Sequence, residues 1–131
     1  MIPTLKGIDH IHVYTSDRTA AQAWFADVMA LEPIEAFLPW AEGGGPLTLS
    51  DPTDQIHIAL FERDSFKPTS TIAFGASGDQ FLEWKRHLES KGLALRISDH
   101  DMAYSLYFQD PDNNVYEITT YEPDLVRKAL T

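Results

Sequence analysis

The chain has 131 residues, a formal net charge of −10 and no cysteine, so it can form one compact domain or two small similar modules. The acidic balance, with no local Lys/Arg cluster, argues against binding to nucleic acid or to anionic membranes. The lack of cysteine excludes disulfides and thiolate ligands, so any bound metal must use nitrogen and oxygen donors. The first six residues lack the apolar core of a signal peptide and no apolar run reaches membrane-spanning length, which predicts a cytoplasmic protein.

The first predicted strand carries two histidines that point the same way. The run Gly7–Tyr14 is rich in β-branched and aromatic residues and ends at a turn-forming Thr-Ser-Asp sequence. Because side chains alternate across a strand, His10, His12 and Tyr14 share one face. Polar side chains at adjacent positions of one face predict a lined cavity rather than a packed core.

A helix, a strand and a hairpin are predicted after this first strand. Ser16 or Asp17 can cap a helix that runs to about residue 30, and Pro33 interrupts the helical pattern. We expect strands at residues 34–40, 47–50 and 55–61, separated by glycine- and proline-rich turns. The first half of the chain therefore has the order β-α-β-β-β.

The same order of elements is predicted for the second half, after a linker at residues 67–70. A strand begins at Thr71, and the capping-box sequence Ser77–Gln80 starts a helix that ends at Lys91-Gly92. Strands at residues 93–97, 104–108 and 115–120 and a short final helix at 123–130 follow. The chain thus reads as two βαβββ modules of the α+β class, residues 1–66 and 67–131, packed as one compact domain.

Superposing the two halves by element order makes two pairs of positions equivalent. His10 falls on Thr71 at the start of the first strands, and His57 falls on Glu117 within the last strands. A repeated fold of this kind places function between the two halves.

Three segments carry a resemblance to a known family. The openings Ile8-Asp9-His10-Ile11 and Ser70-Thr71-Ile72-Ala73-Phe74, and the closing Asp110-Pro111-Asp112-Asn113-Asn114-Val115-Tyr116-Glu117, resemble the vicinal oxygen chelate superfamily. Its members include glyoxalase I, bleomycin-resistance proteins, fosfomycin-resistance enzymes and extradiol dioxygenases. The resemblance covers nearly the whole chain and implies curved sheets that form a cleft around a divalent metal. It also implies a homodimer, with the cleft built either within one chain or across two.

The resemblance implies that His10, His57 and Glu117 are metal ligands. Thr71 occupies the fourth ligand position, where the family usually has histidine. Two imidazoles and one carboxylate suit Zn, Ni, Mn or Fe(II). The metal would act as a Lewis acid on two oxygens of a small-molecule substrate, and Glu117 would also serve as the catalytic base. These features imply a glyoxalase-like, metal-dependent enzyme of the lyase or isomerase type.

Thr71 keeps other hypotheses open. A dioxygenase would use the positions of His10, Thr71 and Glu117, so the missing histidine argues against it. A metal-free binding or drug-sequestering protein of the bleomycin-resistance type is the main alternative. His12 can line the pocket or join the ligands, and Arg96 can meet an anionic substrate or lie in solvent. The expected pocket residues are His12, Tyr14, Phe61, Thr71, Ser105 and Tyr107.

Overall fold

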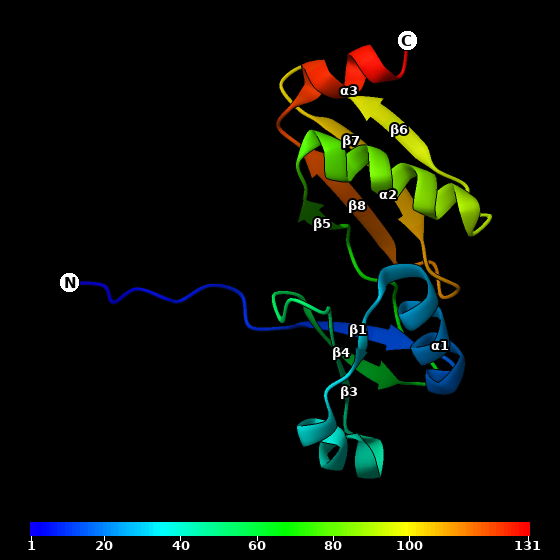
Figure 1. Cartoon of the computed structure of the whole chain (residues 1–131). Coiled ribbons are helices and arrows are strands. Elements are labelled where there is room, and N and C mark those ends of the chain that lie inside the picture. Colours follow the sequence, from blue (N-terminus) through cyan, green and yellow to red (C-terminus); the bar gives the residue numbers. More distant parts are fainter. The chain divides into compact units, whose positions relative to one another are not determined.

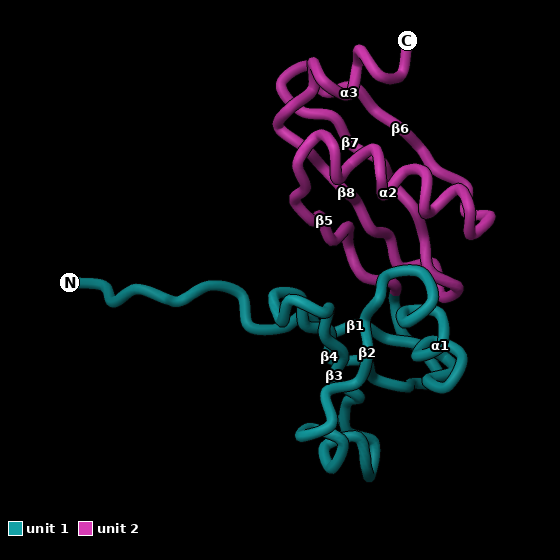
Figure 2. The backbone as a smooth tube through the Cα atoms, viewed as in Figure 1, with its two compact units in different colours: residues 1–67 teal, residues 68–131 magenta.

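The computed structural model describes residues 1–131, which divide into two compact units, Met1–Lys67 and Pro68–Thr131 (Figure 2). Both units have the order β-α-β-β-β, so the predicted tandem βαβββ fold of the α+β class is confirmed. Unit 1 contains β1 (Ile11–Thr15), α1 (Arg18–Met29), β2 (Glu32–Pro33), a 3-10 segment η1 (Glu35–Gly44), β3 (Leu47–Ser50) and β4 (His57–Glu62). Unit 2 contains β5 (Ile72–Gly75), α2 (Gly78–Ser90), β6 (Arg96–Asp99), β7 (Tyr104–Gln109), β8 (Val115–Thr120) and α3 (Pro123–Ala129).

The sheet of unit 1 has the strand order β1-β4-β3-β2. β1 runs parallel to β4, and the other pairs are antiparallel. Val13, Leu49 and Leu60 are fully buried on the same side as Phe25 of α1. Because side chains alternate along each strand, the register that sets His12 beside Ala59 and Ala59 beside Thr48 puts these three on the opposite, open face.

The sheet of unit 2 repeats this arrangement with the order β5-β8-β7-β6. α2 lies across one face of the sheet (Figure 1), where its Phe81 and Leu88 are fully buried together with Leu106. Tyr107 and Glu117 are neighbours in the register and occupy the other face. No helix in either unit has the length and apolar character needed to cross a membrane.

The capping hydrogen bonds confirm where both predicted helices start. The Asp17 side chain accepts a hydrogen bond from the Ala20 backbone N–H, which satisfies one donor of the first turn of α1. Ser77 and Gln80 form a reciprocal capping box at the start of α2.

The predicted strand at residues 34–40 is wrong. Only Glu32 and Pro33 pair with β3, and the chain then turns into η1, two short 3-10 stretches joined by a kink at Glu42 and Gly43. The apolar and aromatic residues of this stretch have strand-like composition, but Pro39 lacks the N–H that a ladder requires. The first strand also begins later than expected, at Ile11, and β6 begins at Arg96.

Candidate functional site

A pocket of about 560 Å³ opens on the uncovered face of the unit 1 sheet. Thr48 and Ala59 contribute from β3 and β4. One side is apolar and comes from η1 and its flanks: Ile34, Phe37, Trp40 and Pro46. The other side is polar and comes from the start of β1 and from the hairpin between β3 and β4: Asp9, His10, His12, Asp54 and His57. His10 and His12, which the sequence places on one face, both line this pocket.

His10 is oriented by the aspartate that precedes it. Its Nδ1 lies 2.7 Å from the Asp9 carboxylate, and since a carboxylate only accepts, Nδ1 carries the proton. Its Nε2 lies 3.1 Å from Nε2 of His12, with the ring centroids 5.0 Å apart. In the neutral ring this Nε2 therefore carries the lone pair, and it is through the lone pair of a ring nitrogen that histidine binds a metal.

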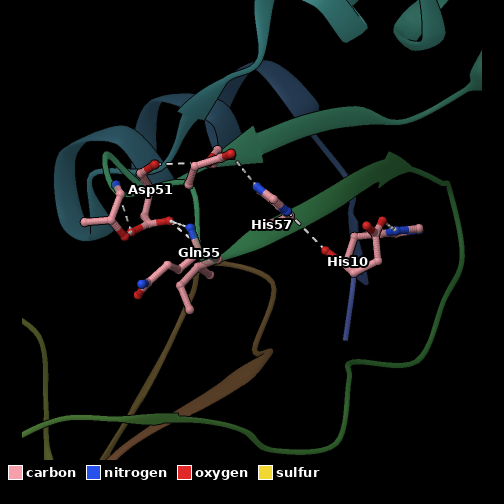
Figure 3. Close-up of polar contacts among 9 residues, drawn as sticks. His10, Asp51, Gln55 and His57 are labelled. Atoms are coloured by element: carbon pink, nitrogen blue, oxygen red, sulfur yellow. Dashed lines mark hydrogen bonds and ion pairs between the residues drawn. The ribbon is translucent and has the colours of Figure 1, made fainter. Parts of the chain in front are cut away.

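His57 uses both ring nitrogens within the chain. Nδ1 lies 3.1 Å from the backbone carbonyl oxygen of Asp9, and Nε2 lies 2.7 Å from Oδ1 of Asp54 (Figure 3). Both partners are acceptors, so the arrangement holds a doubly protonated, cationic imidazole. The hydrogen bond to Asp54 raises the pKa of His57, and the same bond lowers the pKa of Asp54. In this arrangement His57 has no lone pair to offer a metal.

The hairpin between β3 and β4 positions Asp54. The Asp51 carboxylate accepts the backbone N–H groups of Gln55 and Ile56 at 2.8 and 2.7 Å (Figure 3). Partial burial acts to raise the pKa of Asp51, but these bonds and those from Thr53 outweigh it and lower that pKa to about 2. Asp54 itself takes a left-handed conformation with φ of 62°. Sequence reasoning missed the role of Asp54, although a turn of the form Asp-Pro-x-Asp was a usable signal.

Glu117 is held on the open face of the unit 2 sheet. It lies between Tyr107 of β7 and Ala73 of β5 in the register. The hydroxyl of Ser105, a fully buried residue, donates to Oε2 of Glu117 at 2.7 Å. Oε1 accepts no hydrogen bond within the chain. The sheet thus presents a half-buried carboxylate with one oxygen fixed and the other available.

Tyr107 is packed between two other polar residues of unit 2. The Arg96 guanidinium lies 3.9 Å from the centroid of the Tyr107 ring, a cation–π distance. His100 Nε2 lies 3.0 Å from the Tyr107 hydroxyl. Arg96 and Tyr107 also line a second, shallower cleft of about 350 Å³. Arg96 is therefore a positioned cation on the face that carries Glu117.

The remaining predicted site residues have different surroundings. Thr71 is exposed just before β5. Tyr14 and Phe61 share the open face of unit 1, with ring centroids 5.7 Å apart, but neither lines the 560 Å³ pocket.

Across the chain, no three His, Asp or Glu side chains converge in a group that could hold a metal. His10 and Glu117 belong to different units.

The strand registers correct the predicted equivalence of His57 and Glu117. His12 pairs with Ala59 in unit 1, and Ala73 pairs with Glu117 in unit 2. When His10 is matched with Thr71, Glu117 therefore falls on Ala59. His57 begins β4 as Val115 begins β8, so the predicted equivalence is displaced by two residues.

The chain belongs to the Glyoxalase/Bleomycin resistance protein/Dioxygenase superfamily, whose family model matches residues 7–118. This confirms the resemblance found in the opening and closing segments, and it agrees with the repeated βαβββ architecture.

Solved structures with the same fold include three of differing origin. An integron cassette protein from the Halifax Harbour sewage outfall metagenome is 19% identical, with a TM-score of 0.76 over 88% of this chain and 99% of that one. A putative glyoxalase family protein from Bacillus anthracis is 20% identical, with a TM-score of 0.74 over 93% and 100% of the two chains. The fosfomycin resistance protein FosX from Listeria monocytogenes, complexed with Mn(II) and sulfate, is 20% identical, with a TM-score of 0.68 over 98% and 100%.

Proposed function

We propose that this chain is a divalent-metal-dependent enzyme that acts on a small oxygen-bearing substrate, by a glyoxalase-like lyase or isomerase reaction. The observation that carries the proposal is the presentation of Glu117, whose carboxylate is fixed through Oε2 by the buried Ser105 hydroxyl. A carboxylate in a partly buried position is costly unless it is paired or bound to a cation. The family context adds that FosX, a protein with the same fold, is complexed with Mn(II).

The donor chemistry of two residues fits a divalent ion. His10 offers Nε2 in the tautomer set by Asp9, and Glu117 offers Oε1. The nearest further ring nitrogen is Nε2 of His12, 3.1 Å from that of His10; in this hydrogen bond it carries the proton, so His12 would have to change tautomer to bind a metal through it. His57 does not fit as a ligand while it is paired with Asp54, and the Thr71 hydroxyl is a weak donor. We therefore assign His10 and Glu117 as ligands and move His57 to the pocket wall.

The protein's own groups have distinct tasks in this proposal. Asp9 fixes the His10 ring, Ser105 fixes the Glu117 carboxylate through Oε2, and Glu117 would serve both as a ligand and as the base that accepts a proton from the substrate. A bound divalent ion would supply Lewis-acid stabilisation of a substrate oxyanion. His57, paired with Asp54, forms part of the wall of the unit 1 pocket.

Titration of the purified protein with Mn(II), followed by calorimetry, tests this assignment. We expect one ion per chain and at least about tenfold weaker binding in His10→Ala and in Glu117→Gln, since each removes a donor. His87→Ala and Glu83→Gln serve as matched controls, because both lie on α2, which covers the opposite face of the unit 2 sheet. Absence of saturable Mn(II) binding, or equal binding by all five proteins, would refute the proposal.

A metal-free binding protein of the bleomycin-resistance type is the second candidate. Thr71 at a usual ligand position and the lack of a three-residue metal group favour it. It predicts ligand affinity that does not change when EDTA is added. Thr71 also disfavours a dioxygenase, because the metal ligands of a dioxygenase would include a histidine at this position.

A further inference from the structure

The segment between β2 and β3 has no counterpart in unit 2. Residues 34–46 separate β2 from β3 and include the whole of η1, Glu35–Gly44. In unit 2 the equivalent strands, β6 and β7, are joined directly by residues 100–103. Since the two modules otherwise repeat one another, this insertion is a feature specific to the unit 1 pocket.

The insertion places an aromatic pair against the pocket. The rings of Phe37 and Trp40 stack with centroids 4.3 Å apart and an angle of 10° between their planes. Both line the pocket, and Trp40 is nevertheless 57% exposed. An exposed, ordered aromatic surface beside a cavity is available to stack on a flat ligand.

Hydrogen bonds fix this aromatic pair in place. The Arg18 guanidinium donates to the carbonyl of Gly45 at 3.0 Å, and the Arg63 guanidinium donates to the carbonyl of Gly44 at 3.3 Å. At the other end of the insertion, the Ile34 backbone N–H donates to the carbonyl of Thr48 at 2.9 Å. The wall is therefore organised before a ligand arrives, which lowers the entropic cost of binding.

The charged groups of the pocket limit what it can hold. Its lining includes the carboxylates of Asp9 and Asp54 and no lysine or arginine. The one cation that the lining offers, His57, is already bonded to Asp54. His57 thus offsets the charge of Asp54, and the carboxylate of Asp9 leaves an excess of negative charge that repels an anionic ligand but not a neutral or cationic one.

We propose that the unit 1 pocket binds a planar aromatic ring, uncharged or cationic, stacked against the Phe37–Trp40 pair. This rests on the proposed function, for which it names the substrate class: a molecule with an aromatic body that lies on the η1 wall and oxygen substituents that face His10. Stacking supplies affinity for the aromatic body, and the excess negative charge of the lining selects against acids.

Calorimetric titration with four probes of one size, in buffer with EDTA, tests the proposal without any metal. The probes are 2-naphthol, its saturated analogue decahydro-2-naphthol, the cation N-methylquinolinium and the anion 2-naphthoate. We expect 2-naphthol and N-methylquinolinium to bind and decahydro-2-naphthol to bind roughly 3- to 10-fold more weakly, because it cannot stack. We expect 2-naphthoate to bind roughly fivefold more weakly than 2-naphthol.

Variants of the wall complete the test. Trp40→Leu and Phe37→Leu should each weaken 2-naphthol binding roughly 3- to 10-fold, whereas Trp84→Leu on α2 should leave it unchanged. The proposal is overturned if no probe binds, if the saturated and aromatic probes bind equally, or if Trp40→Leu and Phe37→Leu, both folded by circular dichroism, bind like the parent protein.

Mn(II) titration in parallel separates this inference from the proposed metal-dependent function. Mn(II) binding without aromatic binding refutes only this inference, and aromatic binding without Mn(II) binding refutes only the metal-dependent function.

Discussion

Single side chains in this protein are positioned by neighbours on the same face of a sheet or in the same turn. Alternation along a strand was enough to predict that His10 and His12 share a face, because that property is local. The partners of His57 could not be predicted in the same way, because Asp54 reaches it through the conformation of a hairpin loop and Asp9 through a backbone carbonyl in the segment before β1.

Ser105 should act as a positioning residue for Glu117. Ser105→Ala removes the hydroxyl that holds Oε2 of Glu117 at 2.7 Å, so we expect Mn(II) affinity to fall roughly tenfold. Ser105→Thr keeps a hydroxyl and should restore most of that affinity, which a purely structural role would not predict. Ser98→Ala, at the register neighbour of Ser105 on β6, is the matched control. Equal affinity in the parent, Ser105→Ala and Ser98→Ala proteins would contradict this role.

At the scale of elements, the helices and hairpins were predictable, while the η1 insertion was not. Capping residues and glycine stops act within one turn of chain, so the starts of α1 and α2 follow from the sequence. Residues 34–40 combine strand-like apolar residues with Pro39, and their conformation depends on anchoring by Arg18 and Arg63, which lie far away in the chain. Composition alone carries no information about such contacts.

Gly45 should be required for the η1 insertion. A Cβ at this position would collide with the backbone carbonyl oxygen of Trp40, so Gly45→Ala must displace the end of the insertion. We expect a loss of roughly 1–3 kcal/mol in the free energy of unfolding, measured by urea denaturation, and weaker binding of 2-naphthol. Gly75→Ala is the control, since its Cβ would meet nothing within 4 Å. If both variants unfold at the same urea concentration as the parent protein, the close approach is not a constraint.

The C-terminal helix α3 should contribute a pH-dependent part of the stability. Arg127 donates to both carboxylate oxygens of Asp99 at 2.8 Å, and these bonds lower the pKa of Asp99 to about 2. The unfolded chain binds this proton more tightly, so the stabilisation is present above about pH 4 and is lost as the pH falls towards 2.

Denaturation of Asp99→Asn at pH 5, 4 and 3 checks this contribution. The variant should be less stable than the parent protein at pH 5, and the difference should shrink at each lower pH. Asp64→Asn, at an exposed position, should show no such trend. A stability difference that stays constant from pH 5 to pH 3 would show that the Asp99–Arg127 pair is not its source.

For the whole molecule, the repeat made the fold predictable and hid one feature of the site. Element order agrees between the halves, which was enough to identify the tandem βαβββ fold that the family match confirms. The same agreement suggested that His57 corresponds to Glu117. The two-residue displacement between them is visible only once the strand registers are known.

The resemblance to the family predicts a homodimer. Sedimentation equilibrium should give twice the mass of one chain at micromolar concentration. A heterodimer of one His10→Ala chain and one Glu117→Gln chain, isolated with two different tags, then reports how the site is built. A site that combines unit 1 of one chain with unit 2 of its partner leaves one intact metal site per heterodimer, whereas a site within one chain leaves none. A mass of one chain at all concentrations would refute the dimer.

The central claim is that His10 and Glu117 hold the same metal ion. The most direct test is a double-mutant cycle on the Mn(II) dissociation constant, with the parent protein, His10→Ala, Glu117→Gln and the double variant. If both residues bind one ion, each substitution should weaken Mn(II) binding much less in the variant that already lacks the other residue than in the parent protein. The two effects should therefore be strongly non-additive. Additive effects, or Mn(II) affinity that neither substitution changes, would contradict the claim.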